Sequence, residues 1–233
     1  MGSEELSYIL IGRKAMFTDP LTVSSDKFSY PIPTMSALKG ITEQIYWKPT
    51  FKYEVTEVTV LNEIKRSSEN ILLVGMQTQS GKTSSQLARY SFLDDVCYLV
   101  KVRMVWNESR PDLMQDRDFR KHTSIFNRYL KRGGKRNINL GTSECNRAYV
   151  IPVNDYEVTN SFYEGKTLEF PSVFCGYTYP DVEGVTDIYA KFSPLTMVNG
   201  VIKYPRLDDC VNSRYIKTVT KNYNQIYGDK KEV

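Results

Sequence analysis

The chain of 233 residues contains a single histidine, His122, which lies beside Lys121 in its most basic stretch. Between Arg117 and Arg136 there are eight lysines or arginines and one acidic residue, Asp118. An imidazole can transfer protons near neutral pH, and clustered cations can hold a phosphate and stabilise charge that develops on it. RNA cleavage without a metal ion needs both groups. A lone histidine is also often a packing or surface residue, so both interpretations stay open.

This stretch has the apolar spacing of a helix over residues 116–132. Its apolar positions are Phe119, Ile125, Phe126, Tyr129 and Leu130. His122 lies three residues after Phe119 and four before Phe126, at the border of the apolar stripe. The ring is therefore either packed in the core or held by its apolar side with one nitrogen facing a groove. Gly133 and Gly134 end the helix, and the surrounding charges favour a phosphate-binding loop over a merely solvated face.

A second helix is predicted from about Met35 to Trp47, with Thr34 as its N-cap. Ala37, Leu38, Ile41 and Ile45 fall on one face of it. Gly40 inside the helix suggests that another backbone approaches closely there. Tyr46, next to the apolar face, is able to present its hydroxyl at the surface, whereas Trp47 is expected to pack.

The order of the predicted elements indicates an α+β fold. Strands are expected at residues 7–17, 53–61, 96–106 and 147–153, a hairpin at 70–75 and 88–92, and the two helices at 35–47 and 116–132. This β-α-β, hairpin, β-α-β order is typical of a ferredoxin-like, RRM-like domain with an extended β-hairpin, assigned to residues 1–155. RNA binding is a frequent function of that fold.

Residues 156–233 are predicted to form a small β-rich C-terminal domain. Residues 155–185 show little periodicity, whereas 187–192 and 195–204 resemble antiparallel strands, with Asn199-Gly200 as a strong hairpin signal.

Composition indicates an ordinary soluble protein, with 41% hydrophobic and 25% charged residues and a net charge of +4. Cys97, Cys145, Cys175 and Cys210 form no Cys-x-x-Cys pair, and with one histidine a zinc site is not expected. We expect no metal, no cofactor and no disulfide framework. The acidic start and the lack of a long apolar run predict a cytoplasmic protein without signal peptide or membrane partner.

One motif is misleading. Gly75 to Thr83 resembles a phosphate-binding P-loop, but five residues separate Gly75 from the Gly81-Lys82 pair where the motif needs four. The residues that follow have strand character, whereas a P-loop leads into a helix. A polar hairpin loop is favoured, in which Lys82 is still able to contact nucleic acid.

Several segments resemble one known family. Residues 29–49, which end in Ile-Tyr-Trp-Lys-Pro, resemble the signature of the CRISPR-associated Cas-five proteins of subtype I-C, the Dvulg type. Residues 12–20, the Lys121-His122 helix, Leu140-Gly-Thr142 and residues 197–201 support the resemblance in the same order, over about residues 7–205. One departure is Ser143-Glu-Cys145, where family members usually have Arg-Glu-Phe.

The resemblance implies a metal-independent, sequence-specific endoribonuclease that cuts CRISPR precursor RNA at the 3′ base of the repeat hairpin. It would then stay on the 5′ handle within the type I-C surveillance complex (Cascade), beside the backbone and large subunits. Tyr46, Lys121 and His122 match the family's catalytic trio. The ribose 2′-OH would be the nucleophile, leaving a 2′,3′-cyclic phosphate and a 5′-OH. His122 would act as acid or base, and Lys121 would stabilise the phosphorane. Tyr46 would orient the 2′-OH or help to deprotonate it, and the ordinary tyrosine pKa near 10 favours orientation.

The expected RNA contacts are basic residues and the two loop glycines. They are Arg13, Lys14, Lys39, Lys48, Arg117, Arg120, Arg128, Lys131, Arg132, Gly133, Gly134, Lys135 and Arg136. Three alternatives remain: a subunit that binds the handle without cutting, a nucleotide hydrolase using the Gly-Lys-Thr loop, and an unrelated ferredoxin-like protein with a fortuitous basic helix.

Overall fold

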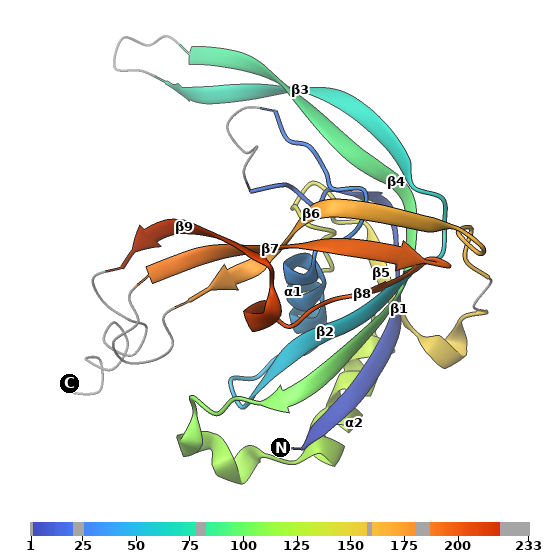
Figure 1. Ribbon diagram of the computed structural model, residues 1–233, viewed down its shortest axis with the longest axis vertical. Coiled ribbons are helices and arrows are strands. Elements are labelled where there is room, and N and C mark those ends of the chain that lie inside the picture. Colours follow the sequence, from blue (N-terminus) through green and yellow to red (C-terminus); the bar gives the residue numbers. More distant parts are fainter. Residues whose placement is uncertain (1, 21–25, 78–82, 158–159, 180–186, 220–233) are drawn as a thin grey trace.

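A sheet of antiparallel strand pairs organises the computed structural model, which describes residues 2–20, 26–77, 83–157, 160–179 and 187–219 (Figure 1). Its strands are β1 (Ser3–Ala15), β2 (Phe51–Val60), β3 (Lys65–Gln77), β4 (Thr83–Trp106), β5 (Ala148–Pro152), β6 (Thr167–Thr178), β7 (Asp187–Val198), β8 (Val201–Lys203) and β9 (Asn212–Thr218). The helices are α1 (Met35–Ile45) and α2 (Phe119–Leu130), with short 3₁₀ turns η1 (Pro111–Asp116), η2 (Val153–Asp155) and η3 (Leu207–Asp209).

The strand order in the sheet is β5-β1-β4-β2-β8-β7-β6, with β3 paired to β4 and β9 paired to β7. Helix α1 contacts β2 and β6, and α2 contacts β1 and β5. Figure 1 accordingly shows α1 between the N-terminal strands and the β6–β7 pair. The fold is thus mostly antiparallel sheet with few helices.

Helix α1 begins where its capping residue predicts. The Thr34 hydroxyl accepts a hydrogen bond from the Ala37 N–H at 3.2 Å, as expected for an N-cap. The helix ends at Ile45 and not at Trp47, because Tyr46 already has an extended backbone with φ −161°. The close backbone approach expected at Gly40 is wrong, since a Cβ there would meet nothing within 4 Å.

Strand β4 merges two predicted strands. Residues 88–92 and 96–106 belong to one strand of 24 residues, which continues through Asp95 although that residue has a positive φ of 51°. Its first half pairs with β3 to form the predicted hairpin, and its second half pairs with β1 and β2. The hairpin loop 78–82, with Lys82, lies outside the described residues. The chain resumes at Thr83 as a strand, where a P-loop would need a helix.

The C-terminal segment contains a strand that sequence periodicity missed. Strand β6 lies in the region that showed little pattern, and its pairing with β7 is interrupted between Phe170 and Val173 and again between Phe174 and Gly176. Such bulges break the alternation of inward and outward side chains on which strand prediction depends. The Asn199-Gly200 turn is confirmed, with φ values of 53° and 81° at the tip between β7 and β8.

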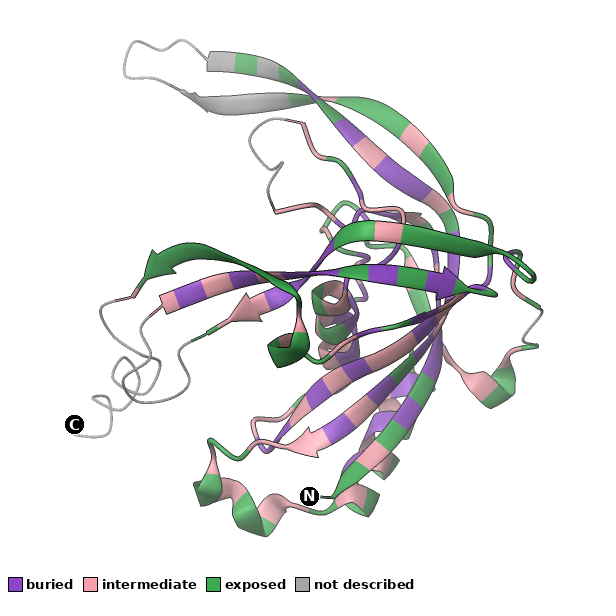
Figure 2. Ribbon diagram, in the orientation of Figure 1, coloured by how far each residue is buried: buried purple, intermediate pink, exposed green. Residues whose placement is uncertain are grey.

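The two predicted domains share this sheet through β2 and β8. Glu57 pairs with Lys203, Val58 with Ile202 and Thr59 with Val201. One core cluster contains side chains from both segments, among them Val58, Met197 and Ile202 at 0% exposure. Figure 2 shows buried residues concentrated in β1, β2 and β4, whereas β9 is exposed along its length. The boundary near residue 155 stays a prediction.

Among the described residues, no helix combines the length and the apolar character needed to cross a membrane.

Candidate active site

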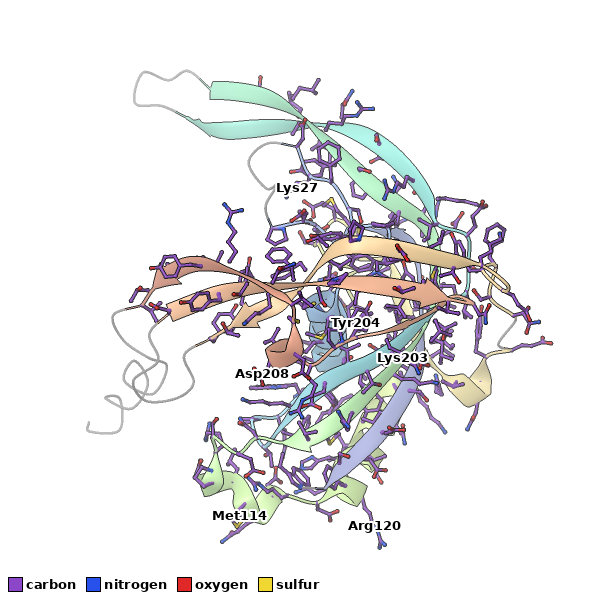
Figure 3. All side chains as sticks on the ribbon, viewed as in Figure 1. Lys27, Met114, Arg120, Lys203, Tyr204 and Asp208 are labelled. Atoms are coloured by element: carbon purple, nitrogen blue, oxygen red, sulfur yellow. The ribbon has the colours of Figure 1, made fainter. Side chains whose placement is uncertain are left out.

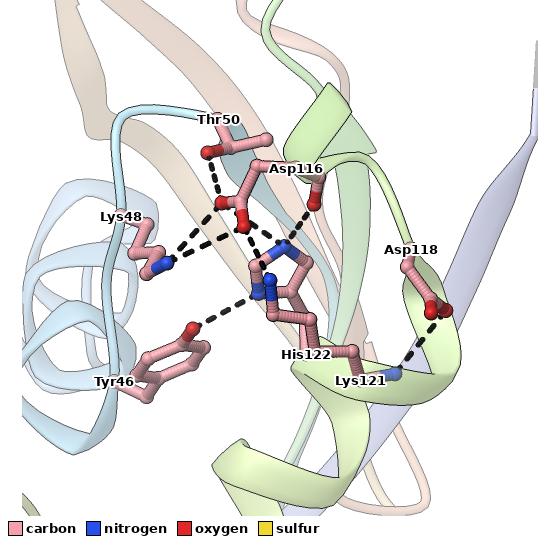
Figure 4. A network of polar contacts seen from close by, with 7 residues as sticks. All are labelled: Tyr46, Lys48, Thr50, Asp116, Asp118, Lys121 and His122. Carbon is pink, nitrogen blue, oxygen red and sulfur yellow. Dashed lines mark hydrogen bonds and ion pairs between the residues drawn. The ribbon is translucent and has the colours of Figure 1, made fainter. Parts of the chain in front are cut away.

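The structure brings the three residues of the predicted trio together. Tyr46 follows α1, Lys121 and His122 lie in the first turn of α2, and the Tyr46 hydroxyl is 2.9 Å from His122 Nδ1 (Figure 4). Asp118 caps α2 by accepting a hydrogen bond from the Lys121 N–H at 3.2 Å. Consecutive helix residues point in different directions, so the Lys121 side chain is 47% exposed while His122 faces inward.

His122 is fully buried, with 0% exposure. The Phe51 ring meets its imidazole edge-on at a centroid distance of 5.0 Å, and Trp106 lies at 6.1 Å. Of the two placements left open by the sequence, the ring is therefore in the core, and both of its nitrogens have protein partners.

Those partners determine the tautomer of the imidazole. His122 Nε2 is 2.8 Å from the backbone carbonyl oxygen of Asp116. A carbonyl only accepts hydrogen bonds, so Nε2 carries the proton. In the neutral ring Nδ1 is then an acceptor, and the Tyr46 hydroxyl donates to it. The proton of Tyr46 is thus directed at a nitrogen that is able to take it.

Tyr46 is 3% exposed, so the hydroxyl that the sequence placed at the surface is buried against His122, whereas Trp47, which was expected to pack, is 45% exposed. Burial, with a smaller contribution from the charge of Asp116, raises the pKa of Tyr46 to about 12, so its hydroxyl keeps its proton at neutral pH. The Tyr53 hydroxyl donates to the Tyr46 carbonyl oxygen at 3.0 Å, and the Tyr129 ring stacks on Tyr46 at 5.9 Å.

Asp116, at the end of η1, is the residue of this site that sequence reasoning missed. Its carboxylate accepts from Lys121 Nζ at 2.5 Å, Lys48 Nζ at 3.2 Å and the Thr50 hydroxyl at 2.8 Å. The Lys121 ammonium, helped by Thr50 and Lys48, holds the pKa of the Asp116 carboxyl well below its usual range. The only sequence signal was an acid just before the basic helix, which gives no hint of contacts to residues 48 and 50.

The basic loop after α2 is fixed beside Tyr46. The backbone N–H groups of Lys135 and Arg136 donate to the carbonyl oxygens of Ile45 and Gln44, at 3.1 and 3.0 Å. Gly133 and Gly134 have φ values of 82° and 108°, which allow the turn that ends α2. The basic side chains of Arg128, Lys131, Arg132, Lys135 and Arg136 are all exposed. The loop therefore presents its cations next to the residue that carries the hydroxyl.

Other predicted RNA contacts are distributed elsewhere. Arg13 is exposed on β1, Lys14 forms an ion pair with Glu69 of β3, and Lys39 is exposed on α1. Lys39 also lines a cleft of about 670 Å³, which extends over β2, β4 and the η3 region.

Three further predicted contacts have different surroundings near the trio. Arg117 donates to Glu108 at 3.2 Å and to the Asn107 carbonyl oxygen at 3.0 Å, so its guanidinium fastens the segment before η1. Arg120 points outward from the end of the molecule opposite Lys27 (Figure 3). Lys48 is the predicted contact that the structure brings to the trio itself, through Asp116.

The structure explains why glycine stands at the centre of Leu140-Gly141-Thr142. Gly141 has a φ of 91°, and a Cβ there would lie 2.0 Å from the Met16 carbonyl oxygen. Leu140 in turn accepts a hydrogen bond from the Met16 N–H at 3.0 Å. The step therefore joins the end of β1 to the loop after α2, and the departure at Ser143–Cys145 leaves the trio untouched.

Within the described part of the chain, no three His, Cys, Asp or Glu side chains converge as a metal site would require.

Comparisons with known proteins show the family to which the chain belongs. The family model for the CRISPR-associated protein Cas5d matches residues 6–205. Two curated relatives are named CRISPR pre-crRNA endoribonuclease Cas5d. The one from Thermus thermophilus is 32% identical over 132 residues, covering 52% of this chain and 52% of the relative. The one from Mannheimia succiniciproducens is 26% identical over 140 residues, covering 52% of this chain and 60% of the relative.

The match thus spans only about half the length of these curated relatives. A solved structure described as a CRISPR-associated protein matches more completely, with a TM-score of 0.73 and 34% identity over 92% of this chain and 98% of that chain. Because the family model covers most of its residues, the chain belongs to the Cas5d family of CRISPR-associated proteins.

Proposed function

We propose that the chain is a metal-independent endoribonuclease that cleaves CRISPR precursor RNA at the 3′ base of the repeat hairpin. The observation that carries the proposal is the hydrogen bond between the Tyr46 hydroxyl and His122 Nδ1, with the Lys121 ammonium group beside the pair. The names of the curated relatives, CRISPR pre-crRNA endoribonuclease Cas5d, support the same substrate class.

The buried histidine favours a relay through the tyrosine. In the proposed reaction the ribose 2′-oxygen bonds to the adjacent phosphorus and the bond from phosphorus to the 5′-oxygen breaks. Tyr46 orients the 2′-OH and accepts its proton while passing its own to His122 Nδ1. Lys121 stabilises the negative charge of the phosphorane. The leaving 5′-oxygen takes a proton from water, and the His122 imidazolium then returns its extra proton to solvent through Tyr46. The products are a 2′,3′-cyclic phosphate and a 5′-OH, and one acid–base group of this kind typically contributes about 10²–10⁴-fold in rate.

The proposal extends to partners and location. After cleavage the chain stays on the 5′ handle of the CRISPR RNA, as a cytoplasmic subunit of the type I-C surveillance complex with the backbone and large subunits. The exposed cations of the loop at residues 131–136, fixed beside Tyr46, support an RNA path from the trio over this loop.

The fold proposal is a ferredoxin-like unit with an extended hairpin. The order β5-β1-β4-β2, with α1 between β1 and β2 and α2 between β4 and β5, supports it. In this arrangement β3 and the first half of β4 are the hairpin that extends the unit.

One observation favours a second candidate, a subunit that binds the handle without cutting. His122 is 0% exposed and both of its nitrogens are engaged inside the protein, as they would be in a histidine that only packs. In that case the basic loop would still bind RNA, and the trio would serve to join α1 to α2.

Cleavage of the cognate repeat hairpin in EDTA separates the candidates, run beside the same RNA with a 2′-deoxy sugar at the cut site. The nuclease proposal predicts cutting in EDTA, a 2′,3′-cyclic phosphate end and no cutting of the deoxy substrate. If the hairpin binds tightly but stays intact under all conditions, the handle-binding candidate is correct. The mechanism would be refuted if the deoxy substrate were cut. It would also be refuted if EDTA abolished cleavage of the unmodified hairpin.

A further inference from the structure

Asp116 acts on the trio through two different groups. Its carboxylate binds Lys48 and Thr50, which follow α1, and Lys121 on α2 (Figure 4). Its backbone carbonyl oxygen accepts from His122 Nε2 at 2.8 Å, and the carboxylate oxygen Oδ2 lies 3.6 Å from the same nitrogen. The side chain is thus bound to the segment after α1 and to α2, while the backbone carbonyl contacts the imidazole.

The carboxylate has the means to hold that carbonyl in place. Asp116 is the last residue of η1, and its carbonyl oxygen also accepts a hydrogen bond from the Asp118 N–H at 3.0 Å, two residues ahead in the chain. Three donors from two separate segments converge on its side chain, which is 23% exposed. Charged partners make these hydrogen bonds stronger than neutral ones. Releasing them would leave the Asp116 carbonyl held only by the Asp118 N–H, so that it could rotate away from Nε2.

We propose that Asp116 is a positioning residue that fixes the His122 tautomer by clamping its own carbonyl against Nε2, and that it holds the Lys48 and Lys121 ammonium groups at the trio. In the neutral imidazole, Nδ1 is unprotonated and can accept from the Tyr46 hydroxyl only while Nε2 carries the proton. The catalytic part of the inference rests on the proposed nuclease function, whereas the tautomer does not.

Because Asp116 is negatively charged, the proposal predicts different effects of its removal on RNA affinity and on the cleavage rate. An anion beside the phosphate site opposes RNA binding by simple repulsion. Removing it with Asp116→Asn should therefore leave RNA affinity unchanged or raise it, while slowing the cut. A residue that only repels RNA would instead give tighter binding together with faster cutting, and general unfolding would weaken both.

Because His122 is the only histidine in the chain, nitrogen NMR reads its tautomer without ambiguity. Spectra of ¹⁵N-labelled protein are recorded at about pH 9, where a free imidazole is neutral. We expect the wild type to show protonated Nε2 and unprotonated Nδ1, and Asp116→Asn to show averaging between tautomers. Asp112→Asn is the matched control, since it removes the same charge from η1 at a residue paired with Arg110.

Single-turnover cleavage and hairpin affinity are measured on the same variants. We expect Asp116→Asn to cut roughly 10–100-fold more slowly, by analogy with the loss of residues that orient a metal-bound imidazole. Asp116→Glu should recover part of the rate, and Asp112→Asn should behave as wild type. Unchanged tautomer and rate in a folded Asp116→Asn would overturn the proposal.

A double variant covers the case in which Asp116→Asn does not fold. Lys48→Gln with Thr50→Val removes the two contacts that the segment after α1 makes with the Asp116 carboxylate. This variant should show the same averaging between tautomers. An unaltered tautomer there would also overturn the proposal. If the wild type itself cuts no RNA, the nuclease function fails, and the NMR result still decides whether Asp116 positions His122.

Discussion

At the residue scale, the chemistry of this site depends on how a buried imidazole communicates with the surface. His122 is 0% exposed, so a substrate proton would reach it through the Tyr46 hydroxyl. The pKa of Tyr46, raised to about 12, keeps the hydroxyl protonated until the reaction begins. Of the two roles that the family resemblance implied for Tyr46, the proposed mechanism therefore gives it proton transfer as well as the favoured one, orientation of the 2′-OH.

Tyr46→Phe tests that larger role with the least change to packing. The variant removes one hydroxyl and leaves His122 Nδ1 without its donor, which costs about 1–3 kcal/mol of stability for an unsatisfied buried group. We expect single-turnover cleavage to fall about 10²–10⁴-fold and hairpin affinity to stay within a few-fold. Tyr53→Phe is the control, because its hydroxyl donates only to the Tyr46 carbonyl oxygen and lies one step away from the imidazole. Equal rates for the wild type and Tyr46→Phe would rule out the relay.

At the element scale, features that depend on residues close in sequence could be predicted, whereas contacts between residues far apart in sequence could not. The Thr34 cap and the Asn199-Gly200 turn depend on neighbours in sequence, and both are confirmed. The contacts of Asp116 join residues 66 and 68 positions apart, for which a single sequence carries no pattern. Strand β6 was not predicted because its bulges interrupt the alternation of inward and outward side chains.

Gly40 offers a test of how α1 is stabilised. It lies in the middle of the helix with open space where a Cβ would be, so alanine can be added without a clash. Glycine in a helix interior costs about 1 kcal/mol relative to alanine. We expect Gly40→Ala to raise the unfolding free energy by up to about 1 kcal/mol in urea denaturation. Gly12→Ala should do the opposite, because its Cβ would lie 2.1 Å from Leu140 Cδ1. A less stable Gly40→Ala protein would mean that the glycine has a structural purpose there.

The loop after α2 should supply part of the electrostatic affinity for RNA. Lys135→Ala with Arg136→Ala removes two exposed cations and leaves the backbone hydrogen bonds to α1 in place. Each lost phosphate contact lowers the slope of log affinity against log salt by roughly 0.7–0.9. We therefore expect weaker hairpin binding with a flatter salt dependence.

The control for that loop is a second exposed Lys-Arg pair, Lys65 and Arg66 at the start of β3. Figure 1 shows β3 far from α2, so alanines at this pair should change the binding of a short hairpin little. If both double variants lose the same affinity, RNA binding is general attraction to positive charge rather than recognition by the loop.

At the scale of the whole molecule, one sheet connects the site to the C-terminal strands. The N-terminal and C-terminal segments are joined where β2 pairs with β8. Beside this pairing, the Val60 N–H donates a hydrogen bond to the Gly200 carbonyl oxygen at 2.8 Å. Tyr204 is 8% exposed, and its hydroxyl donates to the Pro33 carbonyl oxygen at 2.5 Å, just before α1. The strands after residue 155 thereby support α1, the helix that Tyr46 follows.

This support predicts how a shortened chain behaves. Residues 1–155 alone would lose β8 from the edge of β2 and β6 from α1, exposing Val58 and the apolar face of α1 to water. We expect this fragment to melt at a lower temperature than the full chain in circular dichroism, or to aggregate. Residues 1–211 are the matched control, because they remove β9, which is exposed at every position. A fragment 1–155 that melts like the full chain would instead establish two independent domains, since its core would then need nothing from the C-terminal strands.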